Sequence, residues 1–134
     1  MTRQTMLIRD SFEQVRLAPQ AIVMLFYGRL FDLDPSLRQL FKIDMKLQSK
    51  KLADTLGAVV DAAEKLDALI PTLRQLGRAH ATYGVLPEHY DTVRQALLWA
   101  LGQALQEDFD TETRAAWDGV LRFCSREMIA GTVG

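Results

Sequence analysis

Four prolines divide the chain into segments of helical spacing, and they constrain the fold more than any other feature. Pro19, Pro35, Pro71 and Pro87 each stand where a run begins in which apolar residues recur every three or four positions. Proline is tolerated in the first turn of a helix, where its missing N–H would have no partner anyway. The apolar–polar alternation that marks a half-buried strand is absent from the sequence. The chain is therefore predicted to be all-α.

Local signals mark where the predicted helices start and stop. Asp34 and Asp110 precede helical segments and are predicted N-caps, and Gly84 follows the last apolar position of its segment and is predicted to end it. These signals give helices over 4–17, 19–33, 35–41, 45–66, 69–83, 87–106 and 110–130. Because repeats and Gly-, Pro- or Ser-rich linkers are absent, residues 1–134 are expected to form one domain. The uneven lengths favour an irregular helical fold over a symmetric four-helix bundle.

The balance of charge and the cysteine count exclude several classes of protein. With 16 Lys and Arg, 17 Asp and Glu and a net charge of −1, the chain lacks the basic face that nucleic acid or an anionic membrane surface requires. Its apolar stretches are too short to span a bilayer, and its first residues lack the apolar core of a signal peptide. The single cysteine excludes an internal disulfide or a thiolate zinc site. We therefore expect a cytoplasmic protein with no nucleic acid and no membrane as partner.

Polar side chains fall on the apolar faces of several predicted helices. The stripe that contains His80 comprises Leu69, Leu73, Leu76, His80 and Tyr83. Tyr27 shares the apolar face of its helix with Val23 and Leu30, and Tyr90 heads a stripe in the helix that follows Pro87. Gln48 lies one turn before Leu52 on another stripe, whereas Lys51 points to the side.

These buried-facing groups have two interpretations. An unpaired buried donor costs about 1–3 kcal/mol, so each group needs a partner. The groups either hydrogen-bond to one another and to backbone carbonyls, or line a pocket for a bound cofactor. His89, in the first turn after Pro87, is predicted at the surface, and Cys124 in the core. The sequence has no phosphate-binding glycine loop after a strand and no carboxylate pair suited to hydrolysis.

Two segments carry a resemblance to a known family. They are MLFYGRLFDLDPSLRQLF at 24–41 and LGRAHATYGVLPEHYDTVRQALLWAL at 76–101. In order and separation they resemble bacterial single-domain globins and the globin module of flavohaemoglobins, and the likeness extends from about residue 7 to residue 128. The resemblance implies a globin fold of about seven helices around a haem pocket, with haem b as the cofactor.

The resemblance also implies roles for individual residues. His80 corresponds to the proximal ligand of the haem iron, and Phe41 to the phenylalanine that packs against the porphyrin. Tyr27 and Gln48 correspond to distal residues that donate hydrogen bonds to a bound ligand, and Leu52 to the apolar distal wall.

The distal register has an alternative, because an ungapped match from Phe41 to flavohaemoglobins places Lys51 and Thr55 at the distal positions. The apolar stripe favours Gln48 and Leu52.

The chain departs from flavohaemoglobins around the predicted proximal ligand. Ala79 stands where they have a basic residue just before the histidine. Tyr90 matches their proximal tyrosine, but the glutamate that completes their proximal network is missing near Thr132. We also expect no reductase module like that of these relatives. These departures argue against a self-sufficient nitric oxide dioxygenase.

The expected function follows from these roles. A neutral imidazole at His80 would hold the iron and leave its other side open to O₂, NO or CO. Hydrogen bonds from Tyr27 and Gln48 predict slow O₂ release, and reaction of the held O₂ with NO, as NO detoxification, would need an external reductase. Two alternatives stay open. One is a haem-free helical interaction or sensor module with His80 in its core; the other is a haem-carrying protein whose distal side closes onto the iron through Gln48, Tyr27 or Lys51.

Overall fold

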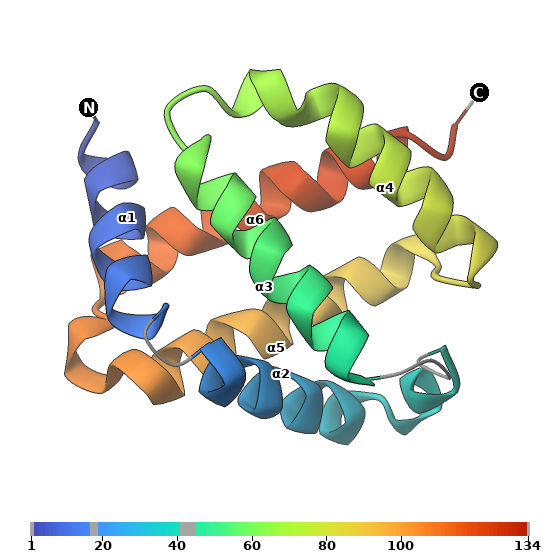
Figure 1. Cartoon of the computed structure of the whole chain (residues 1–134), viewed down its shortest axis with the longest axis horizontal. Helices are drawn as coiled ribbons and strands as arrows, with labels where there is room; N and C mark the ends of the chain where they lie inside the picture. The colour runs from blue at the N-terminus through green and yellow to red at the C-terminus, as the bar shows by residue number, and fades with distance from the viewer. Residues whose placement is uncertain (1, 17–18, 41–44, 134) are drawn as a thin grey trace.

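The computed structural model describes residues 2–16, 19–40 and 45–133, and within them the chain forms six α-helices and three short 3₁₀ helices (Figure 1). In chain order these are α1 (Arg3–Val15), α2 (Pro19–Leu33), η1 (Pro35–Leu40), α3 (Met45–Asp61), η2 (Leu66–Leu69), α4 (Ile70–Thr82), α5 (Pro87–Leu105), η3 (Gln106–Asp108) and α6 (Thr111–Ala130). These ranges contain no strand, and none of their helices is long and apolar enough to cross a membrane. The prediction of an all-α fold is confirmed.

The predicted start and stop signals lie where the sequence placed them. The prolines stand in the first or second position of a helix: Pro19 in α2, Pro35 in η1, Pro71 in α4 and Pro87 in α5. The Asp110 carboxylate accepts a hydrogen bond from the Thr113 N–H at 2.8 Å, and the Asp34 carboxylate accepts one from the Ser36 N–H at 3.1 Å. Gly84 follows α4 with φ of +96°, a conformation that glycine adopts without strain. Both N-caps and the glycine stop are therefore confirmed.

Two predicted helices differ from the structure. The segment 35–41 is a 3₁₀ helix over Pro35–Leu40, and the helix predicted over 45–66 ends at Asp61. Residues 62–65 form a turn instead, closed by a 2.8 Å hydrogen bond from the Lys65 N–H to the Ala62 carbonyl. Alanine, glutamate and lysine at 62–65 are good helix formers, so local propensity does not mark this end. The chain reverses here to bring α4 back along the molecule, and tertiary packing decides the boundary.

The predicted place of Tyr83 on the buried stripe with His80 is wrong. Its side chain is 62% exposed. α4 ends at Thr82, so Tyr83 is the C-cap residue, and the chain leaves the helix axis at Gly84. A stripe extrapolated past a helix end no longer predicts which side a residue faces.

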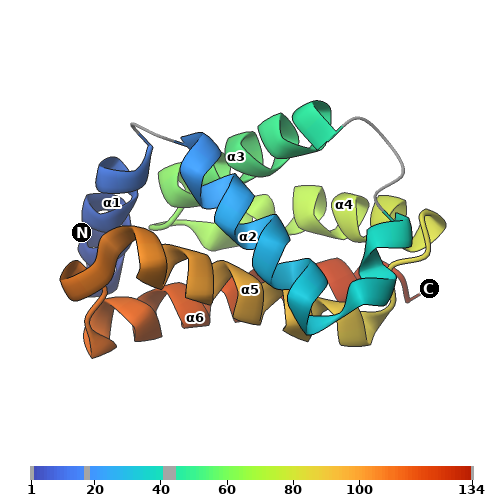
Figure 2. The same cartoon turned by 90° about the horizontal axis from the view of Figure 1, so that it is seen from below.

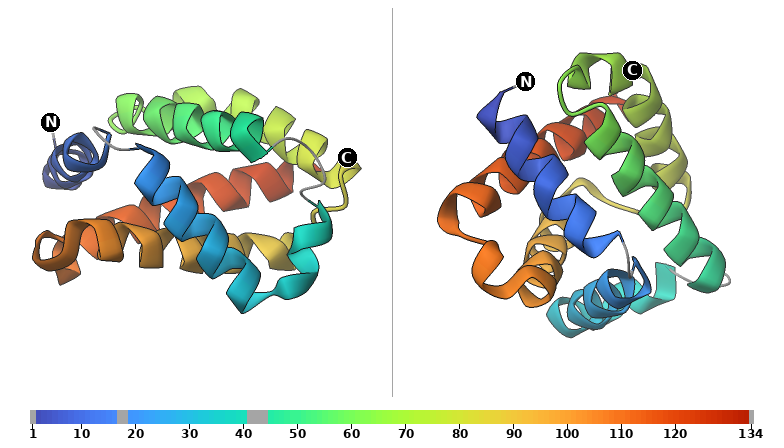
Figure 3. Two further views of the ribbon diagram at one scale, coloured as in Figure 1. Left: turned by 60° about the horizontal axis from the view of Figure 1, so that its bottom comes forward. Right: turned by 60° about the vertical axis from the view of Figure 1, so that its left-hand side comes forward.

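The helices are arranged in two layers with α2 across one side. Figures 2 and 3 show α3 and α4 in one layer, α5 and α6 in the other, and α2 crossing between them. Within the described residues α2 packs most extensively on α5, and α4 on α6. α1 packs against α6 beside the first turns of α2, away from the corner between α4 and α5 (Figure 1).

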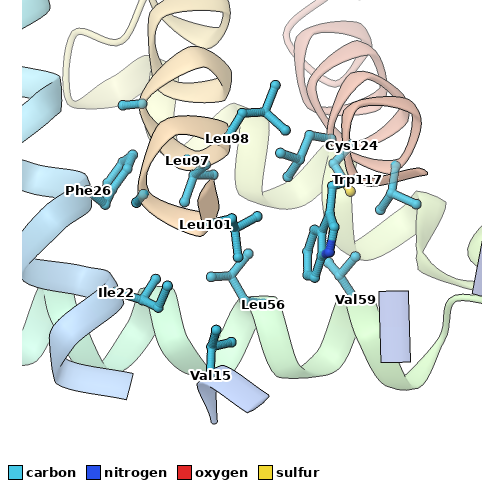
Figure 4. Close-up of a cluster of buried hydrophobic side chains, with 14 of the residues drawn as sticks. Val15, Ile22, Phe26, Leu56, Val59, Leu97, Leu98, Leu101, Trp117 and Cys124 are labelled. Atoms are coloured by element: carbon cyan, nitrogen blue, oxygen red, sulfur yellow. The ribbon is translucent and has the colours of Figure 1, made fainter. Parts of the chain in front are cut away.

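The hydrophobic core gathers around Trp117 on α6 (Figure 4). Its side chain is completely buried, and its indole N–H donates to the Ser11 hydroxyl on α1 at 2.8 Å. That hydroxyl donates in turn to the Leu7 carbonyl at 2.7 Å. Every polar atom of this buried pair thus has a partner, and the pair fixes α1 to α6.

Gly57, in the interior of α3, offers a simple test of the fold. No heavy atom lies within 4 Å of the position that an added Cβ would take. We expect Gly57→Ala to raise the free energy of unfolding by about 0.4–1 kcal/mol, because alanine loses less conformational entropy when a helix forms. Urea denaturation measures the change. A lower stability would mean that this face of α3 is packed more tightly than the structure shows.

Candidate functional site

Three of the four helices that carry described site residues place them toward the same end of the molecule. The first turns of α3, the last turns of α4 and the first turns of α5 all lie at this end (Figures 1 and 2). Among the described residues, α3 and α4 are not a closely packed pair. The helices that carry Gln48 and His80 are therefore not held together by direct helix packing, unlike α4 and α6.

His80, in the last turn of α4, makes one well-defined hydrogen bond. Its Nδ1 lies 2.7 Å from the Leu76 carbonyl oxygen, one turn earlier in the same helix, and the side chain is half-buried. A carbonyl oxygen can only accept, so Nδ1 carries the proton. In the neutral imidazole the lone pair is then on Nε2, which is free to bind a metal.

Tyr90, near the start of α5, is the aromatic neighbour of His80. The two ring centroids are 6.5 Å apart, and the tyrosine is buried. Burial raises the pKa of the Tyr90 phenol, because the charged phenolate loses hydration.

The described residues supply no carboxylate to His80 Nδ1. Glu127 of α6 pairs with Arg74 of α4 at 3.0 Å, and Thr132 donates its hydroxyl hydrogen to the Ile129 carbonyl. The partner of the imidazole is a neutral carbonyl, which donates less electron density to the ring than a carboxylate does.

Tyr27 lies in the middle of α2 among aromatic rings. Its ring centroid is 4.9 Å from that of Phe26 and 6.0 Å from that of Phe31. The residue is only 8% exposed, and burial raises the pKa of its phenol to about 12. The hydroxyl therefore stays protonated at neutral pH and keeps a hydrogen to donate.

The exposure of side chains on α3 distinguishes between the two proposed distal registers. Gln48 and Leu52 are half-buried, whereas Lys51 and Thr55 are exposed. The face of α3 that turns toward the rest of the protein thus contains Gln48 and Leu52. Phe41 lies outside the described residues.

These groups have the chemistry that a haem requires. Within the described residues no cluster of three or more His, Cys, Asp or Glu could hold a metal ion alone. One imidazole with a free Nε2 suffices for an iron whose other ligands come from a porphyrin. The residues present therefore fit the group that the resemblance implies.

Two further predicted residues lie outside this site. Cys124 is buried in the core, where burial raises the pKa of its thiol to about 11, so its predicted core role is confirmed. His89 is half-buried, and its Nδ1 accepts a hydrogen bond from the Leu86 N–H at 2.9 Å. It therefore caps α5, a role that the surface prediction missed.

A crevice of about 790 Å³ lies elsewhere, between α1, α2 and α3. Charged residues of α1 and α3, such as Arg9 and Asp54, line its mouth, and Leu101 and Trp117 lie at its floor. None of the candidate residues described above lines it. The crevice is thus separate from the site around His80.

Comparisons with known proteins give a family match. The family model described as Globin matches residues 25–128. A flavohemoprotein of Oceanobacillus iheyensis is 29% identical over 119 residues, which are 87% of this chain and 29% of the relative. An anaerobic nitrite reductase of Oryza sativa subsp. indica is 26% identical over 121 residues, which are 86% of this chain and 83% of the relative. The chain thus spans under a third of the bacterial relative but most of the plant one.

A solved structure extends the match to three dimensions. It is an engineered carbene transferase derived from a putative nitric oxide dioxygenase of Rhodothermus marinus. The TM-score is 0.85 at 27% identity, over 98% of this chain and 93% of the other.

Proposed function

The chain belongs to the globin family, and from the geometry around His80 we propose that it reversibly binds O₂, NO and CO at a haem iron held by this residue. One observation carries the proposal: the 2.7 Å hydrogen bond from His80 Nδ1 to the Leu76 carbonyl. It fixes the ring orientation and the tautomer that leaves Nε2 to the iron. Metal-bound histidines in proteins commonly have such a second hydrogen bond.

We further propose that the haem is haem b, held without covalent attachment. Attachment of a c-type haem uses two cysteines followed by a histidine, and the chain contains a single cysteine. That cysteine, Cys124, is buried among core residues of α6. Affinity for the haem must therefore come from His80 and from apolar contacts.

The distal residues would select the ligand. Bound haem supplies an iron with one open position for a diatomic ligand. The protonated phenol of Tyr27 and the amide of Gln48 would donate hydrogen bonds to a polar ligand there, and Leu52 would exclude water. O₂ and NO gain from such donors, whereas CO gains little, so we propose slow release of O₂.

We propose that O₂ bound at this site reacts with NO. O₂ held by the Tyr27 and Gln48 donors would be poorly suited to delivery and well suited to oxidising NO to nitrate, a reaction for which bound haem would supply the iron and one electron. The chain's single cysteine, Cys124, is buried, and its raised pKa disfavours the thiolate that would donate electrons. Repeated turnover would therefore depend on an external reductase, and we place this chemistry in the cytoplasm.

A haem titration followed by visible spectroscopy tests the proposal. We expect stoichiometric uptake, a five-coordinate ferrous form and an oxy complex that releases O₂ under argon. Failure to take up haem stoichiometrically would favour the haem-free interaction module. A six-coordinate ferrous form that ignores O₂ would favour the haem-carrying alternative.

A further inference from the structure

α4 and α6 touch backbone to backbone at two glycines. A Cβ added to Gly77 would lie 1.8 Å from the Met128 carbonyl oxygen, and one added to Gly131 would lie 2.1 Å from the Arg74 carbonyl oxygen. Both obstacles are main-chain atoms, which cannot move aside as a flexible side chain can. Only glycine permits this approach at either position.

The two contacts form a matched pair, which we call the α4–α6 clamp. Arg74 and Gly77 are three residues apart on α4, and so are Met128 and Gly131 at the end of α6. Each helix thus contributes one glycine and one main-chain carbonyl to the contact, where α4 and α6 cross (Figure 1). The guanidinium of Arg74 also donates to the Glu127 carboxylate at 3.0 Å, and this ion pair joins α4 to α6 beside the two glycine contacts.

The clamp acts on the turn that holds the predicted iron ligand. Leu76, whose carbonyl accepts the hydrogen bond from His80 Nδ1, is the neighbour of Gly77. His80 itself lies three residues beyond Gly77 on α4. Because the carbonyl and the imidazole belong to one helical turn, they move together with the backbone at Gly77.

α4 has little other support in this region. Among the described residues its close packing is with α6, and with the short η2 that precedes it. α3, the helix with the distal candidates, is not among its closely packed partners. The distance from α4 to α6 therefore contributes to the position of the His80 imidazole, together with its contact to the Tyr90 ring of α5.

We propose that Gly77 and Gly131 are positioning residues, which place the His80 imidazole and so tune its bond to the haem iron. The proposal rests on the proposed haem function. The glycines touch neither haem nor ligand; they act through the backbone of α4. A bulkier residue would push α4 outward and strain the bond between Nε2 and the iron.

Alanine variants test the clamp in the haem-loaded protein. We expect Gly77→Ala to shift the iron–imidazole stretching band in the resonance Raman spectrum of the ferrous form. We also expect haem to be lost about tenfold faster, the range seen when partners of metal ligands are altered. Gly131→Ala should shift the band in the same direction by less. It lies at the very end of α6, where the last turn can unwind without unfolding the protein.

Gly57→Ala is the matched control, since an added Cβ meets nothing at this helical glycine. The proposal is overturned if a folded Gly131→Ala protein has the same band position and the same haem-loss rate as Gly57→Ala. This comparison holds even if Gly77→Ala does not fold. If the unchanged protein takes up no haem, the proposed function fails by itself. The NMR chemical shifts of the His80 ring in the isolated protein, which depend on its position relative to the Tyr90 ring of α5, then decide. A change in these shifts in Gly131→Ala but not in Gly57→Ala supports the clamp, and equal shifts refute it.

Discussion

Replacement of His80 by alanine is expected to abolish stoichiometric haem uptake. The imidazole makes the one proposed bond from this chain to the iron. The Leu76 carbonyl, which accepts from Nδ1, holds the ring in the required tautomer. Altering a neighbour of a metal ligand costs about 10- to 100-fold in affinity, so removing the ligand itself should cost more than about 100-fold. Haem titration monitored at the Soret band measures the loss.

A matched control comes from the other histidine. His89 caps α5 by accepting from the Leu86 N–H, so its ring is already engaged away from the site. His89→Ala should bind haem as the unchanged protein does, at the cost of a helix cap. Free imidazole added to His80→Gly should restore the spectrum, because the small variant leaves room for the ring. An unaltered Soret band in His80→Ala would show that another residue holds the iron.

The helix starts could be predicted from sequence because their causes are local. Each proline lies in the first turn of its helix, and Asp110 accepts a hydrogen bond from a backbone N–H three residues later. The end of α3 at Asp61 has no such local cause, since good helix formers continue past it. Tyr83 was misplaced for a related reason, because the helix stops one residue before it.

The candidate site also has features that could be predicted from the sequence and features that could not. The stripe pattern placed His80, Tyr27 and Gln48 on inward faces, because helical periodicity depends only on spacing. The clamp could not be foreseen, since Gly77 and Met128 are far apart in the sequence and meet through backbone atoms. The capping role of His89 depends on the ring orientation at its helix start, which sequence spacing alone does not determine.

Tyr27→Phe is expected to release O₂ about 10- to 150-fold faster. A hydrogen bond to a charged acceptor contributes about 1.5–3 kcal/mol, and a tenfold change in rate corresponds to about 1.4 kcal/mol. Phenylalanine keeps the packing against Phe26 and Phe31 and removes only the hydroxyl. Stopped-flow mixing of the oxy form with excess CO gives the dissociation rate. Gln48→Leu should have a smaller effect, because an amide on a half-buried side chain is less firmly oriented.

The pH dependence of this rate tests whether the Tyr27 phenol is as buried in the oxy protein as in this structure. Burial raises the pKa of Tyr27 to about 12, so its donor hydrogen is fully present at lower pH and is lost only as pH rises through that value. O₂ release from the unchanged protein should therefore be constant between about pH 6 and pH 10, whereas a phenol with the ordinary tyrosine pKa of about 10 would be half-deprotonated at the upper limit.

Tyr90→Phe, the same chemical change beside His80, is the control for Tyr27→Phe and should leave the rate nearly unchanged. If both variants accelerate release equally, the effect comes from the general loss of a buried hydroxyl, and Tyr27 is not the distal donor. If only Tyr27→Phe does so, the phenol of α2 and the imidazole of α4 lie on opposite sides of the ligand-binding iron.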